Sequence, residues 1–275
     1  MDSPTPESQP ASPAKTKELT SSGPAAAGVL FLVASIVAVG WYAPAGVNLV
    51  LITLLMFLIM LVLGLAITKR PFGILINERN LVSLSRFQMS LWTVVVLAAY
   101  FTFALARIKA SINDPTLKDP LNIILDWHLW ALMGISTTSL VGAPLILSTK
   151  KDKDPDPSVI PKTARAVAEL PADINANRQG TLYANPKMAD ARFTDMFQGD
   201  ELVNTAHIDL AKVQMFYFTI IAVLAFFVLV FNAIVVSNPD LSHLPVLPDG
   251  LVAILGISNA GYLTSKGIDH TKTVP

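Results

Sequence analysis

The sequence predicts an all-α integral membrane protein, a bundle of about six transmembrane helices. Two features of its composition indicate this: 52% of the 275 residues are hydrophobic and only 15% are charged, whereas about a quarter of the residues are charged in soluble domains. The third observation is the distribution of these charges. It leaves several stretches of about 20 residues without an ionisable side chain, which is the length that a helix needs to cross a bilayer.

Five stretches contain no Asp, Glu, Lys, Arg or His: Ala25–Tyr42, Val47–Thr68, Phe87–Ala106, Leu129–Leu147 and Val213–Val236. A sixth, Leu251–Ser265, is also uncharged but short. It reaches a suitable length if its helix begins near Pro248, because proline suits the first turn of a helix. A four-residue turn joins the first two stretches, so residues 25–68 are predicted to form an N-terminal transmembrane hairpin.

The basic residues predict the orientation in the membrane. With the N-terminus inside, 17 of the 20 Lys and Arg lie on the cytoplasmic side, and only Arg107, Lys109 and Lys118 lie outside. Cytoplasmic loops of membrane proteins carry such an excess of basic residues. Both termini are therefore expected in the cytoplasm. Residues 1–24, which are polar and rich in proline and serine, are expected to form a disordered tail, and residues 267–275 a short C-terminal tail.

Comparison of the chain with itself indicates an internal duplication. Residues 83–93 align with residues 209–219 through a polar cap, a base, Gln-Met, a large aromatic residue and Thr at identical spacing. Residues 129–136 align with residues 251–258 through a shared Gly-Ile-Ser. Two such matches, one at each end of a hairpin, favour duplication over chance similarity between apolar segments.

Each copy, residues 83–147 and residues 209–266, leaves the cytoplasm and returns to it. The copies are therefore expected to be parallel hairpins, related by a pseudo-twofold axis along the membrane normal. Ser83 or Ser85 in the first copy, and Asp209 in the second, are predicted N-caps, because their side chains can accept hydrogen bonds from the first free backbone N–H groups.

The polar and small residues of the repeated hairpins are the candidate packing or pore-lining positions: Gln88, Gln214, Gly134, Ser136, Gly256, Ser258 and Asn259. Small residues permit close approach of helices, and the polar groups can form hydrogen bonds between them. Packing of helix on helix is the preferred interpretation, with a pore lining or a ligand pocket as the alternative. Arg86 and Lys212 lie where a basic side chain can extend to lipid phosphates.

Several runs resemble a family of bacterial polytopic membrane proteins with duplicated Gln-Met and Gly-Ile-Ser hairpins: GILINERNLVSLSRFQMSLWT, GTLYANPKMADARFTDMFQGDEL, DLAKVQMFYFT and LGISNAGYLTSK. The resemblance covers roughly residues 70 to 266. It implies a multi-pass protein of the bacterial inner membrane. The family brings no established activity, substrate or catalytic residue with it, so the resemblance assigns no function.

Residues 148–211 are predicted to form a cytoplasmic loop with short amphipathic helices at Lys162–Leu170 and Met188–Gln198. Three apolar residues share one face of the second helix and are the candidate partner-docking residues: Phe193, Met196 and Phe197. Docking of this face on the protein's own membrane domain is the preferred interpretation, with the membrane surface or a partner helix as alternatives.

No enzyme, metal or cofactor is expected. The loop has 64 residues with five prolines and does not easily form an independent core, and the chain contains no recognised catalytic motif. The absence of cysteine excludes Cys-based metal sites. Asp126 and His128 are interpreted as a helix cap and an interfacial ring. Four acidic residues of the loop are interpreted as solvated surface charge: Asp190, Asp195, Asp200 and Glu201.

Two functions are therefore expected, in order of preference. The first is a non-enzymatic membrane anchor or scaffold for a cytoplasmic partner or assembly. The second is an oligomeric channel lined by Gln, Ser, Thr and Asn of the hairpins. A transporter or a membrane enzyme is the least favoured alternative, because the spans lack ionisable residues. The expected partners are the lipid bilayer and either a cytoplasmic protein or further copies of the chain. Twenty basic and twenty acidic residues balance, which argues against nucleic acid.

Overall fold

The computed structural model describes residues 23–114, 117–166, 177–236 and 240–273, so most of the predicted N-terminal tail lies outside the described residues. The α-helices within them are α1 (Gly23–Tyr42), α2 (Val47–Thr68), α3 (Leu84–Asn113), α4 (Trp127–Ser148), α5 (Val159–Ala166), α6 (Leu210–Val235) and α7 (Asp249–Gly267). Short 3-10 helices are η1 (Gly73–Leu75), η3 (Met188–Asp190) and η4 (Phe193–Phe197), and two short antiparallel strands are β1 (Arg178–Gln179) and β2 (Leu182–Tyr183).

Five of the described helices are long and apolar enough to cross a membrane: α1, α2, α3, α4 and α6. The structure thus confirms the coarse prediction of a mostly helical chain with several helices suited to cross a membrane. The sixth predicted span corresponds to α7, a helix of 19 residues with Asp249 in its first turn and Lys266 in its last. Helix α7 does not meet the criteria of length and composition that identify the five candidate spans.

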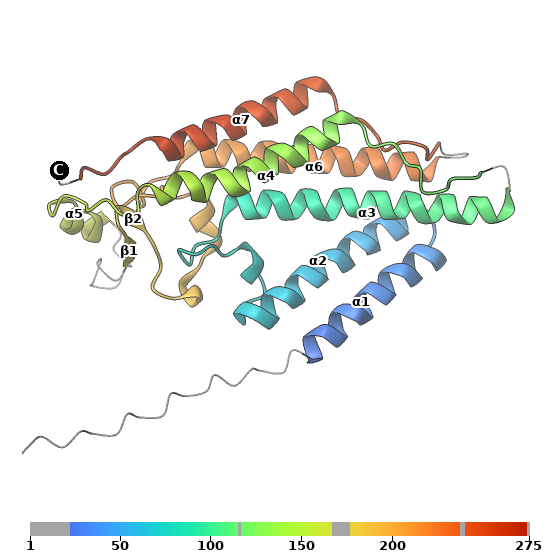
Figure 1. Cartoon of the computed structure of the whole chain (residues 1–275), viewed down its shortest axis with the longest axis horizontal. Helices are drawn as coiled ribbons and strands as arrows, with labels where there is room; N and C mark the ends of the chain where they lie inside the picture. Colours follow the sequence, from blue (N-terminus) through green and yellow to red (C-terminus); the bar gives the residue numbers. More distant parts are fainter. Residues whose placement is uncertain (1–22, 115–116, 167–176, 237–239, 274–275) are drawn as a thin grey trace, which may run out of the picture.

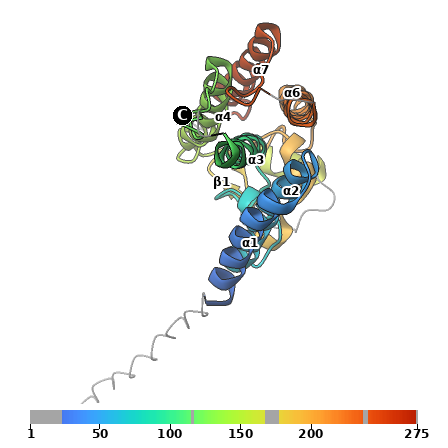
Figure 2. The same ribbon diagram turned by 90° about the vertical axis from the view of Figure 1, so that its right-hand side faces the viewer.

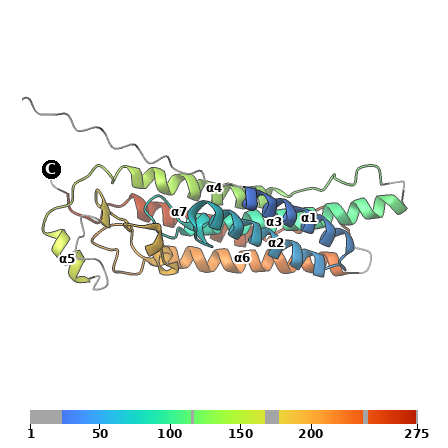
Figure 3. The same cartoon turned by 90° about the horizontal axis from the view of Figure 1, so that it is seen from below.

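Helices α3, α4, α7 and α6 pack in that order around a common core (Figures 1 and 2). Helices α3 and α6 begin, and α4 and α7 end, at the end of the bundle that carries the loop elements (Figure 1). Figure 3 shows α5 at this same end. The hairpin of α1 and α2 packs beside α3, on the side away from α4 and α7 (Figure 2).

The centre of the core lies on α3, which contacts α1, α2, α4 and α6. Trp92 and Phe103 of α3 are fully buried together with Phe226 of α6, and the rings of Trp92 and Phe226 lie 6.2 Å apart between centroids. Apolar side chains on the opposite face of α6 remain exposed: Tyr217, Ile221, Leu224 and Val228. Such an exposed apolar face on a candidate span is suited to contact with lipid.

Of the predicted N-caps, one makes its capping hydrogen bond and another does not. The Oδ1 atom of Asp209 accepts hydrogen bonds from the backbone N–H groups of Ala211 and Lys212, so the predicted N-cap of α6 is confirmed. Ser83 occupies the N-cap position of α3 without a capping hydrogen bond from its side chain. Gly46 has a φ of 80°, and a Cβ there would also collide with α6 side chains at 2.8 Å.

The predicted helix Met188–Gln198 is wrong. The segment forms η3 and η4 instead, separated by extended backbone at Ala191 and Arg192. The Oδ2 atom of Asp195 accepts the N–H groups of Arg192 and Val82, at 2.8 and 3.2 Å. These bonds hold the segment against the turn before α3 and favour separate 3-10 turns over one helix. The other predicted loop helix is described as α5, and residues 167–170 lie outside the described residues.

Candidate functional site

Four charged side chains meet where the loop joins the helix ends, and together they are the Asp200 cluster: Arg79, Asp200, Lys212 and Lys266. Arg79 precedes α3, Lys212 lies in the first turn of α6 and Lys266 in the last turn of α7. Asp200 Oδ1 is 2.5 Å from Arg79 Nη2, and its Oδ2 is 3.1 Å from Lys212 Nζ and 2.7 Å from Lys266 Nζ. Three segments distant in sequence thus share one carboxylate.

The cluster is largely buried, and this determines its electrostatics. Burial alone would raise the pKa of Asp200, but Lys212, Lys266 and Arg79 together outweigh it and hold the pKa well below its ordinary value. The ammonium of Lys266 also lies 4.6 Å from the ring centroid of Tyr262. Arg79 Nη1 donates to the carbonyl oxygens of Tyr183 and Asp200, each at 3.1 Å, so it also ties strand β2 to the helix ends.

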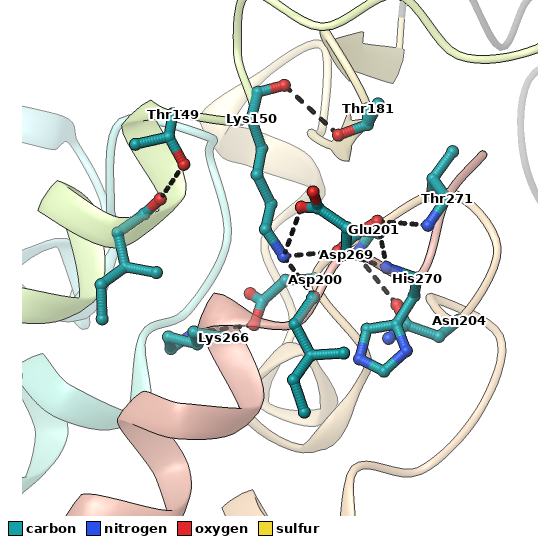
Figure 4. A network of polar contacts seen from close by, with 12 residues as sticks. Thr149, Lys150, Thr181, Asp200, Glu201, Asn204, Lys266, Asp269, His270 and Thr271 are labelled. Carbon is teal, nitrogen blue, oxygen red and sulfur yellow. Dashed lines mark hydrogen bonds and ion pairs between the residues drawn. The ribbon is translucent and has the colours of Figure 1, made fainter. Parts of the chain in front are cut away.

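A second buried ion pair, Lys150 with Glu201, lies beside the cluster (Figure 4). Lys150 follows α4, and its Nζ lies 2.6 Å from Glu201 Oε1 and 2.5 Å from the carbonyl oxygen of Ile268. The carboxylate of Glu201 also accepts the backbone N–H groups of His270 and Thr271. Glu201 therefore joins the end of α4 to the segment that follows α7.

The hairpin of β1 and β2 packs closely on the end of α4. Gly180, in its turn, has a φ of 60°, and a Cβ at this position would lie 2.2 Å from the carbonyl oxygen of Lys151. Asn80 and Asn185 complete the junction, because each side-chain amide donates to the backbone carbonyl of the other, at 2.8 and 3.0 Å. Turn, hairpin and helix end therefore form one connected structure.

A cavity of about 510 Å³ lies beside the Asp200 cluster. The cluster forms its polar wall, with Tyr262 and the hydroxyl groups of α3 nearby. An apolar wall comes chiefly from α3 and α4: Met89, Leu140, Ala143, Pro144 and Leu147. The cavity is thus lined both by charged side chains and by apolar side chains of two candidate spans.

Several predicted packing positions are buried between helices. Ser136 of α4 and Ser258 of α7 are buried, and their hydroxyl oxygens have no hydrogen-bond partner among the described residues. Gln88 of α3 is buried as well, with its Oε1 atom unpartnered in the same part of the chain. Asn259 accepts a hydrogen bond from Ser139 Oγ at 2.5 Å, which is the interhelical bond expected of such a residue.

Other predicted packing positions do not lie at close helix contacts. Gln214 and Gly134 are exposed, and a Cβ added at Gly134 would meet no atom within 4 Å. Within this chain, Gly134 therefore does not lie at a close approach of two helices. Gly256 is half-buried, and a Cβ there would make an ordinary contact with Ile135 at 3.8 Å, so close approach does not require glycine at this position either.

The three predicted partner-docking residues differ in how deeply the structure buries them. Met196 is buried with Leu84, Ala143 and other residues of the helix ends, and the ring of Phe197 packs edge-on against Phe216 at 5.1 Å. Both residues therefore dock the loop on the membrane domain, as preferred above. Phe193 also lies edge-on to Phe216, at 6.4 Å, but remains 60% exposed, so it is the most accessible of the three to a partner.

The interpretation of the loop acids as solvated surface charge is wrong for three of the four. Asp195, Asp200 and Glu201 are all largely buried. For Asp195, burial raises the pKa, although hydrogen bonds from the backbone of Arg192 and Val82 oppose the change. The partners of these acids lie far away in the sequence, so local spacing did not reveal them.

Asp126 and His128 form a contact at the opposite end of the bundle. Asp126 caps α4 by accepting the backbone N–H of His128 at 2.9 Å, which confirms its structural role. The imidazole of His128 contacts Asp126 through Nδ1 and Asp249 through Nε2. Asp249 begins α7, so His128 joins the starts of α4 and α7.

Comparison of the chain with protein-family models, with curated proteins and with solved structures found no match. Membership of the bacterial family that the sequence resembles therefore stays a prediction.

Proposed function

We propose that the protein is a non-enzymatic membrane scaffold, which holds a rigid cytoplasmic platform for a cytoplasmic protein partner or assembly. One observation carries this proposal. The described part of the segment between α4 and α6 has a small apolar cluster, in which Leu202 and Tyr183 pack with Leu81 from the turn before α3. Buried ion pairs also tie this segment to the ends of α4, α6 and α7. A loop fixed in this way can present a constant surface to a partner.

The proposal includes six spans, with α7 as the sixth. At its start, Asp249 contacts His128 at the start of α4. Beyond its end, Thr271 bonds to Glu201 beside the end of α4. Helix α7 therefore runs beside α4 from one end of the bundle to the other. If α4 crosses the membrane, α7 crosses it too, and the loop and the C-terminal segment share one side. The excess of basic residues supports the cytoplasm as that side.

The proposal also retains two parallel, duplicated hairpins. Helices α3 and α6 both begin at the loop end, and the aligned residues Ser136 and Ser258 are both buried. The copies are not used identically, because Gln88 is buried and its counterpart Gln214 is exposed. The two helices differ in their surroundings. The α1–α2 hairpin covers α3, whereas one face of α6 remains exposed.

An oligomeric channel is the second candidate, and one observation favours it. All four helices of the central bundle carry a buried side-chain oxygen without a partner among the described residues: Gln88, Ser136, Thr219 and Ser258. Polar oxygens of this kind can line a pore. In a single chain, however, large side chains such as Trp92 and Phe226 fill the same core, which favours the scaffold.

The two functions can be separated with purified protein in liposomes and a crosslinker in cells. The scaffold predicts no ion flux, and a photo-crosslinking residue at Phe193 should give one defined protein adduct. The same residue at Val228, on the exposed face of α6, should not give that adduct. Ion flux that the double variant Gln88→Leu, Gln214→Leu abolishes in folded protein would contradict the scaffold and favour the channel.

A further inference from the structure

The charges that line the cavity do not balance locally. Glu78 and Arg86 are partly exposed and lie 3.8 Å apart as a weak pair. The buried side then presents three cations, those of the Asp200 cluster, to Asp200 and Asp195. A buried cation without a full counter-charge is unfavourable. The arrangement therefore favours binding of an anion.

Asp195 is less directly engaged with these cations than Asp200. Its Oδ2 atom is bound to the backbone N–H groups of Arg192 and Val82, and burial raises its pKa. Asp200 is thus the principal carboxylate for three cationic side chains. Within the described residues, the ammonium of Lys266 donates its one hydrogen bond to Asp200, so it retains donor capacity toward the cavity.

The cation types and the nearby helix end favour a phosphate. The ammonium groups of Lys212 and Lys266 are point charges of the kind that bind phosphate oxygens. Arg79 adds its positive charge, although its Nη atoms already donate to Asp200 and Tyr183. Helix α3 begins at Leu84, and Ser83, Leu84 and Ser85 all line the cavity, which adds the partial positive charge of a helix N-terminus. A phosphomonoester carries about −1.5 to −2 charges at neutral pH and three strong acceptor oxygens, so it offers these donors more acceptors than a single carboxylate.

The apolar wall indicates what carries the phosphate. Met89, Leu140 and Leu147 line the cavity from α3 and α4, which are candidate membrane spans. A soluble phosphate would gain nothing from these side chains, whereas a hydrocarbon chain would be removed from water beside them. The volume of about 510 Å³ lies within the range of small-molecule sites.

We propose that this cavity binds a lipid with a phosphomonoester headgroup, with the phosphate at the three cations of the Asp200 cluster and the hydrocarbon chain along the apolar wall. This role is independent of the scaffold function, because it requires no protein partner. It gives the platform a lipid ligand at the membrane surface.

The test uses the full chain, purified in a maltoside detergent, and isothermal titration calorimetry. The probes are dodecyl phosphate, below its critical micelle concentration, and inorganic phosphate. Dodecyl phosphate should bind saturably to one site per chain. Inorganic phosphate should bind at least about tenfold more weakly, since it shares only the headgroup contacts. Equal affinities for the two probes would overturn the assignment to a lipid.

Three variants locate the site. Lys266→Gln should weaken binding of dodecyl phosphate at least about tenfold. Ala143→Phe, which fills the apolar wall, should weaken dodecyl phosphate but not inorganic phosphate. Lys153→Gln removes a cation that pairs with Asp269 outside the cavity and should leave binding unchanged. Wild-type binding in folded Lys266→Gln overturns the proposal. If that variant does not fold, wild-type binding of dodecyl phosphate by Ala143→Phe overturns it instead.

Discussion

At the scale of single residues, Asp200 determines how the loop meets the membrane domain. Its two oxygens contact cations from the turn before α3, from α6 and from α7. The partners Arg79 and Asp200 are 121 residues apart in the chain. No local pattern marks such a pairing, which is why the sequence predicted a solvated acid at this position.

Replacement of Asp200 by Asn should destabilise the folded protein strongly. The substitution leaves three buried cations without their common carboxylate, and loss of one partner from a buried ion pair costs ~3–5 kcal/mol. Asp269→Asn is the control, because Asp269 is half exposed and its pairs should contribute only ~0–1 kcal/mol. Unfolding in mixed detergent micelles measures both variants. Similar losses for the two would contradict the central role of Asp200.

The stabilisation by Asp200 should persist down to acidic pH. Its pKa is lowered on folding, so its contribution is present above the unfolded pKa of about 3.9 and is lost only as pH falls through the lower folded value. The difference in unfolding free energy between wild type and Asp200→Asn should therefore be constant from about pH 8 to about pH 5. A difference that disappears near neutral pH would show that the carboxylate does not face the cations.

At the scale of elements, local composition predicted the apolar helices but not the structure of the loop. A charge-free stretch of about 20 residues must satisfy its backbone internally in lipid, so its helix follows from its own sequence. The spacing of Phe193, Met196 and Phe197 suggested a helix as well. There, however, the carboxylate of Asp195 binds two backbone N–H groups, one of them from Val82. A distant contact thus determined the local backbone.

Two glycine replacements should have opposite effects. Gly180→Ala places a Cβ against the carbonyl oxygens of Lys150 and Lys151 and forces a non-glycine residue to keep a positive φ, which alone costs ~1–2 kcal/mol. Gly134→Ala meets no atom within 4 Å and should raise helix stability by up to ~1 kcal/mol.

Limited trypsin digestion and thermal unfolding test this pair of variants. Gly180→Ala should expose the loop to cleavage several-fold faster than wild type, because the β1–β2 hairpin detaches from α4, while the helices stay folded. Digestion of Gly134→Ala should match wild type. If Gly180→Ala is cleaved at the wild-type rate, the hairpin does not depend on this close packing.

At the scale of the whole molecule, the bias of Lys and Arg predicts the topology. Reporter fusions at Asp114 and Asp240 should register as external, and fusions at Lys153 and Pro275 as cytoplasmic, because 17 of the 20 basic residues then lie inside. The Pro275 fusion also tests α7, since an external signal there, with a cytoplasmic signal at Lys153, would mean that α7 does not cross. An external signal at Lys153 would reverse the orientation.

The sequence predicted the class of the whole molecule better than its candidate site. Composition alone indicates a multi-pass helical protein, because the bilayer restricts a chain to few structures. The site depends instead on contacts such as Lys150 with Glu201 and Lys266 with Asp200, which join segments 51 and 66 residues apart. Lys212 was expected to reach lipid phosphates directly, and the structure places it on Asp200 instead.

The contact of Glu201 with the C-terminal segment has a consequence for biosynthesis. Glu201 leaves the ribosome 70 residues before Thr271, whose backbone N–H it accepts, and Lys150 precedes its acceptor Ile268 by 118 residues. The platform therefore cannot be completed while the chain is still being translated through α6 and α7. Its last bonds form only after α7 and the segment that follows it have been synthesised.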